Sequence, residues 1–184
     1  KHYSEALNLA QQRNVWFEGA ILNRLGRIHA EMGNLQEGQA LCERGWNRCK
    51  AANADECEAE ARINLGSIAR DLGRLSDARS QFEQALQIFR SKHNLSGQAA
   101  ALDALGQAQL ILGDKEEAQT LAEQALRIYS QVGDHKGKVS ALGSLGRLAE
   151  ENGDFPTASR RYEQAMAIAL PAMDPRGEAT IHSS

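Results

Sequence analysis

The sequence predicts an all-α protein built from repeated pairs of antiparallel helices. Glycine and other small residues recur at a fixed step of 40 residues, which is the signature of a repeated structural unit. The alternating β-branched or aromatic runs of strands are missing, and aromatic residues make up only 5% of the chain. The three prolines, Pro156, Pro171 and Pro175, all lie late in the chain, so little interrupts a helix before them.

Length and composition favour a protein that folds in water. The chain has 184 residues, of which 42% are hydrophobic and 24% charged, near the average for globular proteins. Its apolar runs, such as residues 110–112, fall far short of the roughly 18 to 20 residues that span a bilayer. The formal net charge is -3, which argues against a protein that binds nucleic acid through a basic surface. We therefore expect neither a membrane nor a nucleic-acid partner.

Four columns of small residues define the repeat. They share one register, so a single unit of 40 residues explains all of them. The columns are Gly26, Gly66, Gly106 and Gly146; Gly33, Gly73, Gly113 and Gly153; Gly38, Ala78, Ala118 and Ala158; and Gly45, Ala85, Ala125 and Ala165.

The first helix of each unit is predicted from its apolar spacing. In the first full unit Ile21, Leu25, Ile28 and Met32 follow steps of four, three and four, which places them on one helix face. The helix is expected to end at the Gly33 column, because a residue beyond the last turn needs positive φ.

The second helix of each unit is predicted to open directly after this turn and to run about four turns. The residues that precede it are Asn34, Arg74, Asp114 and Asp154. A further polar column marks the joint to the next unit, because Asn and Asp accept turn and helix-cap geometry. Its members are Asn14, Asn94, Asp134 and Asp174, with Ala54 as the exception.

Glycine within the first helix requires a reason, because it costs roughly 1 kcal/mol relative to alanine in a helix interior. Gly26, Gly66, Gly106 and Gly146 face the small residues of the second helix in the predicted pair. We expect these glycines to let the two backbones of each pair approach closely.

The pattern L-G-x6-G-x4-A-x6-A resembles the tetratricopeptide repeat (TPR). It is seen in Leu65-Gly66, Gly73, Ala78 and Ala85, and again in the neighbouring units. The 40-residue form is similar to the TPR arrays of LGN/Pins polarity adaptors and of bacterial STAND-type and SARP-type regulators. The resemblance implies a right-handed α-solenoid over residues 1–184. Its units are a trailing helix at 2–13, repeats at 18–57, 58–97, 98–137 and 138–174, and the start of a further helix at 175–184.

Catalytic and metal-binding patterns are missing from the sequence. It contains no GxxxxGK[ST], GxGxxG after a strand, HExxH or GxSxG motif, and its five histidines are scattered. We expect no enzyme activity, no cofactor and no metal. Cys42, Cys49 and Cys57 are odd in number and have no CxxC spacing, so the sequence predicts no disulfide framework and favours a reducing cytoplasm.

The resemblance implies that the first helices line a concave surface on which partners bind. The positions beside the buried stripe change in character from unit to unit, whereas the packing columns repeat. Asn64, in the segment ARINLG, matches the asparagine that hydrogen-bonds the ligand backbone in many peptide-binding TPRs. The expected groove residues are Asn23, Arg24, Arg27, Glu31, Ile63, Asn64, Ser67, Arg70, Asp71, Asp103, Gln107, Leu110, Ile111, Arg147 and Glu150.

The function that follows is a non-catalytic scaffold that binds a protein or peptide partner in this groove. One alternative is a regulatory segment of a signal-transduction ATPase or transcriptional regulator, with a small effector as its ligand. A second alternative is a self-assembly module that associates through its repeat ends.

We predict weak self-association of the chain, because both ends are expected to be cut through repeats and to expose apolar surface. The residues expected there include Val15, Trp16 and Phe17 at one end and Tyr162, Met166 and Leu170 at the other. Light scattering over a concentration series measures the mass. A monomeric mass at every concentration would contradict the prediction.

Overall fold

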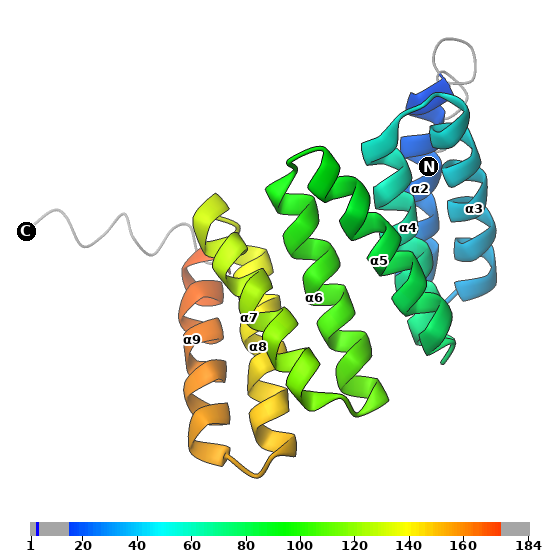
Figure 1. Ribbon diagram of the computed structural model, residues 1–184. Coiled ribbons are helices and arrows are strands. Elements are labelled where there is room, and N and C mark those ends of the chain that lie inside the picture. Colours follow the sequence, from blue (N-terminus) through cyan, green and yellow to red (C-terminus); the bar gives the residue numbers. More distant parts are fainter. Residues whose placement is uncertain (1–2, 4–14, 174–184) are drawn as a thin grey trace, which may run out of the picture. The chain divides into compact units, whose positions relative to one another are not determined.

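The architecture was obtained from a computed structural model, which describes residues 3 and 15–173. The expected helix at 2–13, apart from Tyr3, and the one at 175–184 lie outside the described residues. Within those that are described, all secondary structure is helical and no strand occurs, which confirms the all-α fold class (Figure 1).

The described helices alternate between the first and second members of the predicted pairs (Figure 1). The first members are α2 (Val15–Glu31), α4 (Asp55–Asp71), α6 (Leu95–Leu112) and α8 (His135–Glu151). The second members are α3 (Leu35–Ala51), α5 (Leu75–Ser91), α7 (Lys115–Val132) and α9 (Phe155–Met173). Each first member begins 40 residues after the one before it, so the period read in the sequence is the period of the helices.

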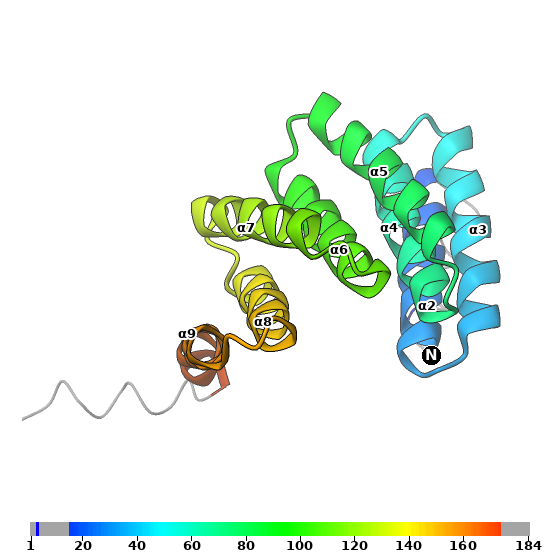
Figure 2. The same cartoon turned by 60° about the horizontal axis from the view of Figure 1, so that its bottom comes forward.

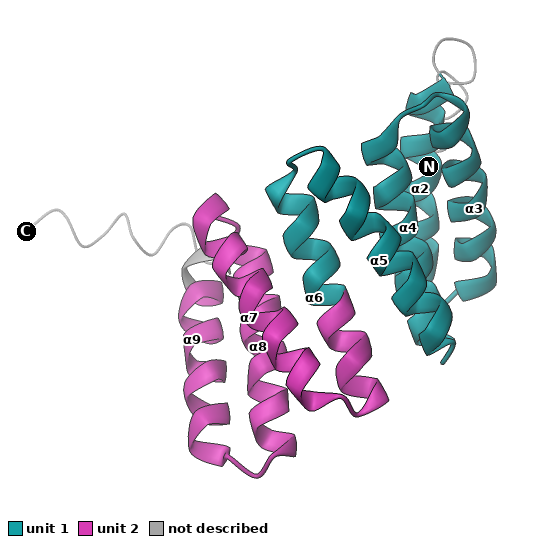
Figure 3. Cartoon of the chain, viewed as in Figure 1, with its two compact units in different colours: residues 1–104 teal, residues 105–184 magenta. Residues whose placement is uncertain are grey.

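The chain divides into two compact units, residues 1–104 and 105–184 (Figure 3). In the first unit α2 packs against α3 and α4 packs against α5, while α4 also contacts α3 and α2 (Figure 2). In the second unit α8 packs against both α7 and α9. Helix α6 begins in the first unit and ends in the second.

The glycines between paired helices adopt the backbone conformation that the sequence predicts. The φ angles of Gly33, Gly73, Gly113 and Gly153 are 87°, 76°, 87° and 77°. In the first of these turns the amide of Gly33 donates to the Ala30 carbonyl. The reversal is sharp enough for the second helix to begin two residues after each glycine, where it was expected.

Polar residues cap several helices at the joints between pairs. The Asp134 carboxylate accepts a hydrogen bond from the Gly137 amide at 2.9 Å, and Asn94 accepts one from the Gly97 amide at 2.8 Å. Ala54, the exception in this column, makes no side-chain cap. At Asn94 and Asp134 the polar column therefore coincides with the residue directly before a first helix.

The apolar stripe of α2 is shorter than the sequence suggested. Ile21 is buried, Leu25 and Ile28 are half-buried, but Met32 is 69% exposed. The reason is that α2 ends at Glu31, so Met32 lies in the turn rather than on the helix face.

The glycines inside the first helices all lie close to the second helix, but not always against its backbone. A Cβ at Gly26 would lie 2.7 Å from the Gly38 carbonyl oxygen, as expected for a close backbone approach, although the Cys42 sulfur lies nearer still. At Gly66 and Gly146 the space is instead filled by the rings of Phe82 and Tyr162. The expectation of backbone contact in every pair was therefore wrong, because an aromatic side chain occupies the same gap in two of them.

This difference predicts unequal responses to the same substitution. Gly66→Ala is expected to destabilise the protein by about 1–3 kcal/mol, because the added Cβ would lie 2.5 Å from the Phe82 ring. Gly106→Ala is the matched control, since its Cβ would lie 3.3 Å from the Ala118 carbonyl oxygen. We expect its free energy of unfolding to stay within about 1 kcal/mol of the native value. Urea unfolding measures both free energies. Equal losses of stability in the two variants would contradict the conclusion that the Phe82 ring fills the space at Gly66.

Candidate functional site

A polar groove lies on the first unit, lined by α2, α4 and the beginning of α6. It consists of two adjoining cavities of about 420 and 290 Å³. Arg27, Ile63 and Asn64 line both cavities, so the two form one continuous depression.

Nine of the expected groove residues line this depression. They come from α2 and α4 at the positions beside the packing stripe, as the helical spacing predicted. They are Asn23, Arg24, Arg27, Glu31, Ile63, Asn64, Ser67, Arg70 and Asp71. Their role in binding a partner stays a prediction.

The other six expected residues lie elsewhere, on α6 and α8. Asp103 and Leu110 are only 6% and 5% exposed, although the sequence placed them on an open surface. Leu110 packs with Ala118 and Leu148 in an apolar cluster of the second unit, so core packing already uses its side chain. Gln107 is half-buried, whereas Ile111, Arg147 and Glu150 are exposed.

Two asparagines connect the groove to the interior. The Asn64 side-chain amide donates to the backbone carbonyl of Asn23 at 3.3 Å. Asn23 is only 1% exposed, although the sequence placed it on an open surface, because its side chain points into the interior, where its amide donates to the backbone carbonyl of Cys57 at 3.3 Å. Asn64 thus uses one of its two N–H donors inside the protein, and its position depends on that of Asn23.

Each arginine of the groove has an acidic neighbour. Arg27 forms an ion pair with Glu31, and Arg70 forms one with Asp71 at 3.0 Å. Burial raises the pKa of Glu60, and the nearby charge of Arg24 acts in the opposite direction. Since the charges are compensated in this way, the groove offers a polar surface without an excess of one sign.

Sequence reasoning missed part of the groove wall. These residues come from the joint between α5 and α6 and from the first half of α4, outside the strip that was followed along the first helices. They are Phe89, Asn94, Ser96, Gly97, Ala100 and Glu60. The polar column contained Asn94, which was the one available signal.

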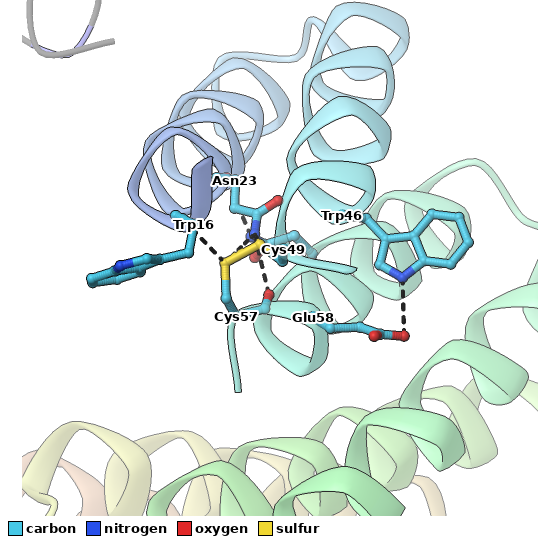
Figure 4. Close-up of a disulfide and its surroundings, with 7 residues drawn as sticks. Trp16, Asn23, Trp46, Cys49, Cys57 and Glu58 are labelled. Atoms are coloured by element: carbon cyan, nitrogen blue, oxygen red, sulfur yellow. Dashed lines mark hydrogen bonds between the residues drawn. A yellow bond between two sulfur atoms is a disulfide. The ribbon is translucent and has the colours of Figure 1, made fainter. Parts of the chain in front are cut away.

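Cys49 and Cys57 form a disulfide, which the sequence analysis did not predict (Figure 4). Their Cα atoms are 5.5 Å apart, because the reversal between α3 and α4 brings the last turn of one helix beside the first turn of the other. The count and spacing of cysteines could not show this contact. The expectation of a reducing compartment rested on the absence of a predicted disulfide, so it no longer has that support.

A second cavity, of about 350 Å³, is lined by α3, α4 and α5. Its most distinctive residue is Trp46, whose indole N–H donates to the Glu58 carboxylate at 3.2 Å (Figure 4). The charged groups of Arg62 and Lys50 lie 5.1 and 5.3 Å from the centre of the Trp46 ring. Because contacts within the chain already engage this ring, the cavity is the weaker candidate.

Two other classes of site have no support in the part of the chain that the structure describes. There, no three His, Cys, Asp or Glu side chains gather in a way that could hold a metal ion. None of the helices combines the length and the apolar character needed to cross a membrane.

Paired helices of constant period, joined by tight turns and packed through small residues, define a helical-repeat protein. The chain belongs to the tetratricopeptide-repeat family, whose sequence model matches residues 17–91, 58–131 and 97–170. Such families are generally non-catalytic scaffolds. No curated protein matches the sequence significantly.

Solved structures of low sequence identity share the fold. BtubC (BKLC) from P. vanneervenii has a TM-score of 0.75 at 22% identity, over 99% of this chain and 74% of that one. A Rap protein complexed with competence and sporulation factor has a TM-score of 0.85 at 16% identity, over 95% of this chain and 49% of the Rap chain. A putative kinesin light chain from Podospora anserina has a TM-score of 0.62 at 20% identity, over 92% and 85%.

The remaining cysteine is expected to be unreactive in the folded protein. Burial, followed by the nearby charge of Glu43, raises the pKa of the Cys42 thiol to about 12. A raised pKa keeps the thiol protonated at neutral pH, and the thiolate is the species that reacts. We expect Ellman's reagent at pH 8 to find no fast-reacting thiol in the folded, oxidised chain and one after unfolding in urea. A fast reaction before unfolding would contradict this.

Proposed function

We propose that the groove on the first unit binds an extended segment of a protein or peptide partner. One observation carries the proposal. The groove is continuous and is lined by positions whose residues differ between repeats, whereas the packing positions are occupied by small residues in every repeat. A scaffold that conserves its packing and varies one face presents different side chains to successive parts of a ligand.

The groove lining suits an extended polypeptide. Amide and hydroxyl groups of Asn64, Ser67 and Ser96 supply the donors and acceptors that a bound backbone needs. Ile63 offers an apolar contact between them. Arg27 and Arg70 can each pair with a carboxylate of the ligand in place of the carboxylate that they contact within the chain. The net gain in binding free energy is modest, because exposed ion pairs contribute little.

A regulatory array is the second candidate function. Its support is the likeness in fold to the Rap protein that was crystallised with competence and sporulation factor, of which the present chain spans about half. In that case the groove would take a short signalling peptide, and a domain outside residues 1–184 would respond. The same surface serves both candidates, so the first test does not depend on the choice.

Peptides selected from a random library displayed on phage test the proposal. We expect the selected peptides to bind the native chain and to lose about tenfold in affinity for the Arg27→Glu/Arg70→Glu variant, by loss of two ion pairs and added repulsion.

The matched control is Arg79→Glu, which reverses an exposed charge on α5, outside the groove. Calorimetry measures affinity, and circular dichroism checks that helicity is unchanged. Normal binding by the groove variant together with loss of binding in the α5 variant would contradict the proposal and assign the site to the second helices of the pairs.

A further inference from the structure

The joint between α3 and α4 differs from its counterparts in the later repeats. At the α5–α6 joint the ring of Phe89 lies directly against Gly97, and at the α7–α8 joint the ring of Tyr129 lies against Gly137. A shift of 40 residues places Cys49 and Cys57 at these same two positions. The first joint thus has a disulfide where the others have an aromatic ring packed on a glycine (Figure 4).

This replacement changes what holds the joint together. Phe89 and Tyr129 are buried, at 3% and 5% exposure, and stabilise their joints by apolar packing, which does not depend on redox conditions. Two cysteine side chains fill much less space than a ring. Without the covalent bond the first joint would also need more separation between its sulfur atoms, in an interior that is closely packed.

The disulfide contacts a residue of the groove directly. The Asn23 side-chain amide lies 3.6 Å from Cys49 Sγ and 3.3 Å from the Cys57 carbonyl oxygen (Figure 4). The backbone carbonyl of the same Asn23 accepts the hydrogen bond from Asn64 in the groove. Asn23 therefore links the two: its side chain contacts the disulfide, and its backbone carbonyl holds the amide of Asn64.

A small reductant has a path to the bond. Cys57 lines a cavity of about 510 Å³ together with Trp16, Arg24 and Glu60. Cys49 is fully buried, whereas Cys57 retains 8% exposure and lines the cavity, so Cys57 is the cysteine that a reductant in the cavity reaches first.

We propose that the Cys49–Cys57 disulfide is a reversible redox latch that holds the groove in its binding conformation. The part of this proposal that concerns ligand affinity rests on the proposed function of the groove. Opening the latch frees Asn23 and weakens the bound segment's contacts with Asn64.

The chemistry is thiol–disulfide exchange with a dithiol. One thiolate of the dithiol attacks the Cys57 sulfur, the bond between the two cysteines breaks, and Cys49 leaves as a thiolate that takes up a proton. The second thiol of the reductant then displaces Cys57 and closes the reductant's own disulfide. Two electrons pass to the protein, which gains two thiols. Exchange with an oxidised dithiol reverses the reaction.

The first experiment needs no ligand. Peptide mapping under non-reducing conditions is expected to recover residues 49 and 57 in one cross-linked species, which dithiothreitol separates. Hydrogen exchange of the amides in residues 58–70 is expected to become about tenfold faster after reduction. A chain that never forms this cross-link, or one whose exchange is the same in both states, would overturn the proposal.

The matched variant transplants the joint of the next repeat. Cys49→Phe/Cys57→Gly gives the α3–α4 joint the same ring and glycine that the α5–α6 joint has. This variant should fold and show no response to dithiothreitol. Cys42→Ala keeps the disulfide and should respond as the native chain does. If the transplanted variant still responds to dithiothreitol, the reductant acts elsewhere and the proposal is wrong. If Cys42→Ala no longer responds, the response depends on Cys42 rather than on the disulfide, which also overturns the proposal.

The second experiment uses a peptide selected on the oxidised chain. Its affinity is expected to fall about tenfold on reduction of the native protein and to stay constant in the transplanted variant. Unchanged affinity with altered hydrogen exchange would overturn the coupling to the groove. A library that yields no binder would count against the proposed function alone, because the exchange measurement still tests the latch.

Discussion

The fold depends on how closely the two helices of each pair approach one another. Glycine in the middle of the first helix has no side chain to hold the two helices apart. The space beside it is filled by a group of the second helix, which differs from pair to pair. In the first pair this is the Cys42 sulfur together with the backbone at Gly38, and in the second it is the Phe82 ring. Since each pair buries its own interface, a 40-residue unit can repeat without changing the packing rule.

The constraint on packing leaves one face of the first helices free to vary. A residue at the packing positions must stay small or apolar, whereas Arg27, Ser67 and Asn64 lie on the open side of α2 and α4. The Arg27 side chain pairs with Glu31 of the same helix, so this contact does not hold the helices together, whereas the Asn64 amide donates to the Asn23 carbonyl of α2. Exposed ion pairs contribute little to stability, so variation at a position such as Arg27 costs little.

The joint between α3 and α4 shows that one geometric requirement can be met by different chemistry. Phe89 on Gly97 and Cys49 bonded to Cys57 both fasten a second helix to the following first helix. Apolar packing is indifferent to the redox state of the surroundings, whereas a disulfide is not. The cysteine joint also contacts Asn23, so the strength of this joint and the position of a groove residue are linked.

The sequence by itself determined the repeat period, the turns at Gly33 and its counterparts, the helix starts, and nine residues of the groove, because these follow from local backbone preferences and helical spacing. Only the tertiary structure decided that Cys49 meets Cys57, that Phe82 fills the space at Gly66, and that Asn23, Asp103 and Leu110 are buried. These outcomes depend on which side chains of different helices come together. A repeating pattern specifies equivalent backbone positions, but the side chain that occupies each gap is settled only when the helices pack.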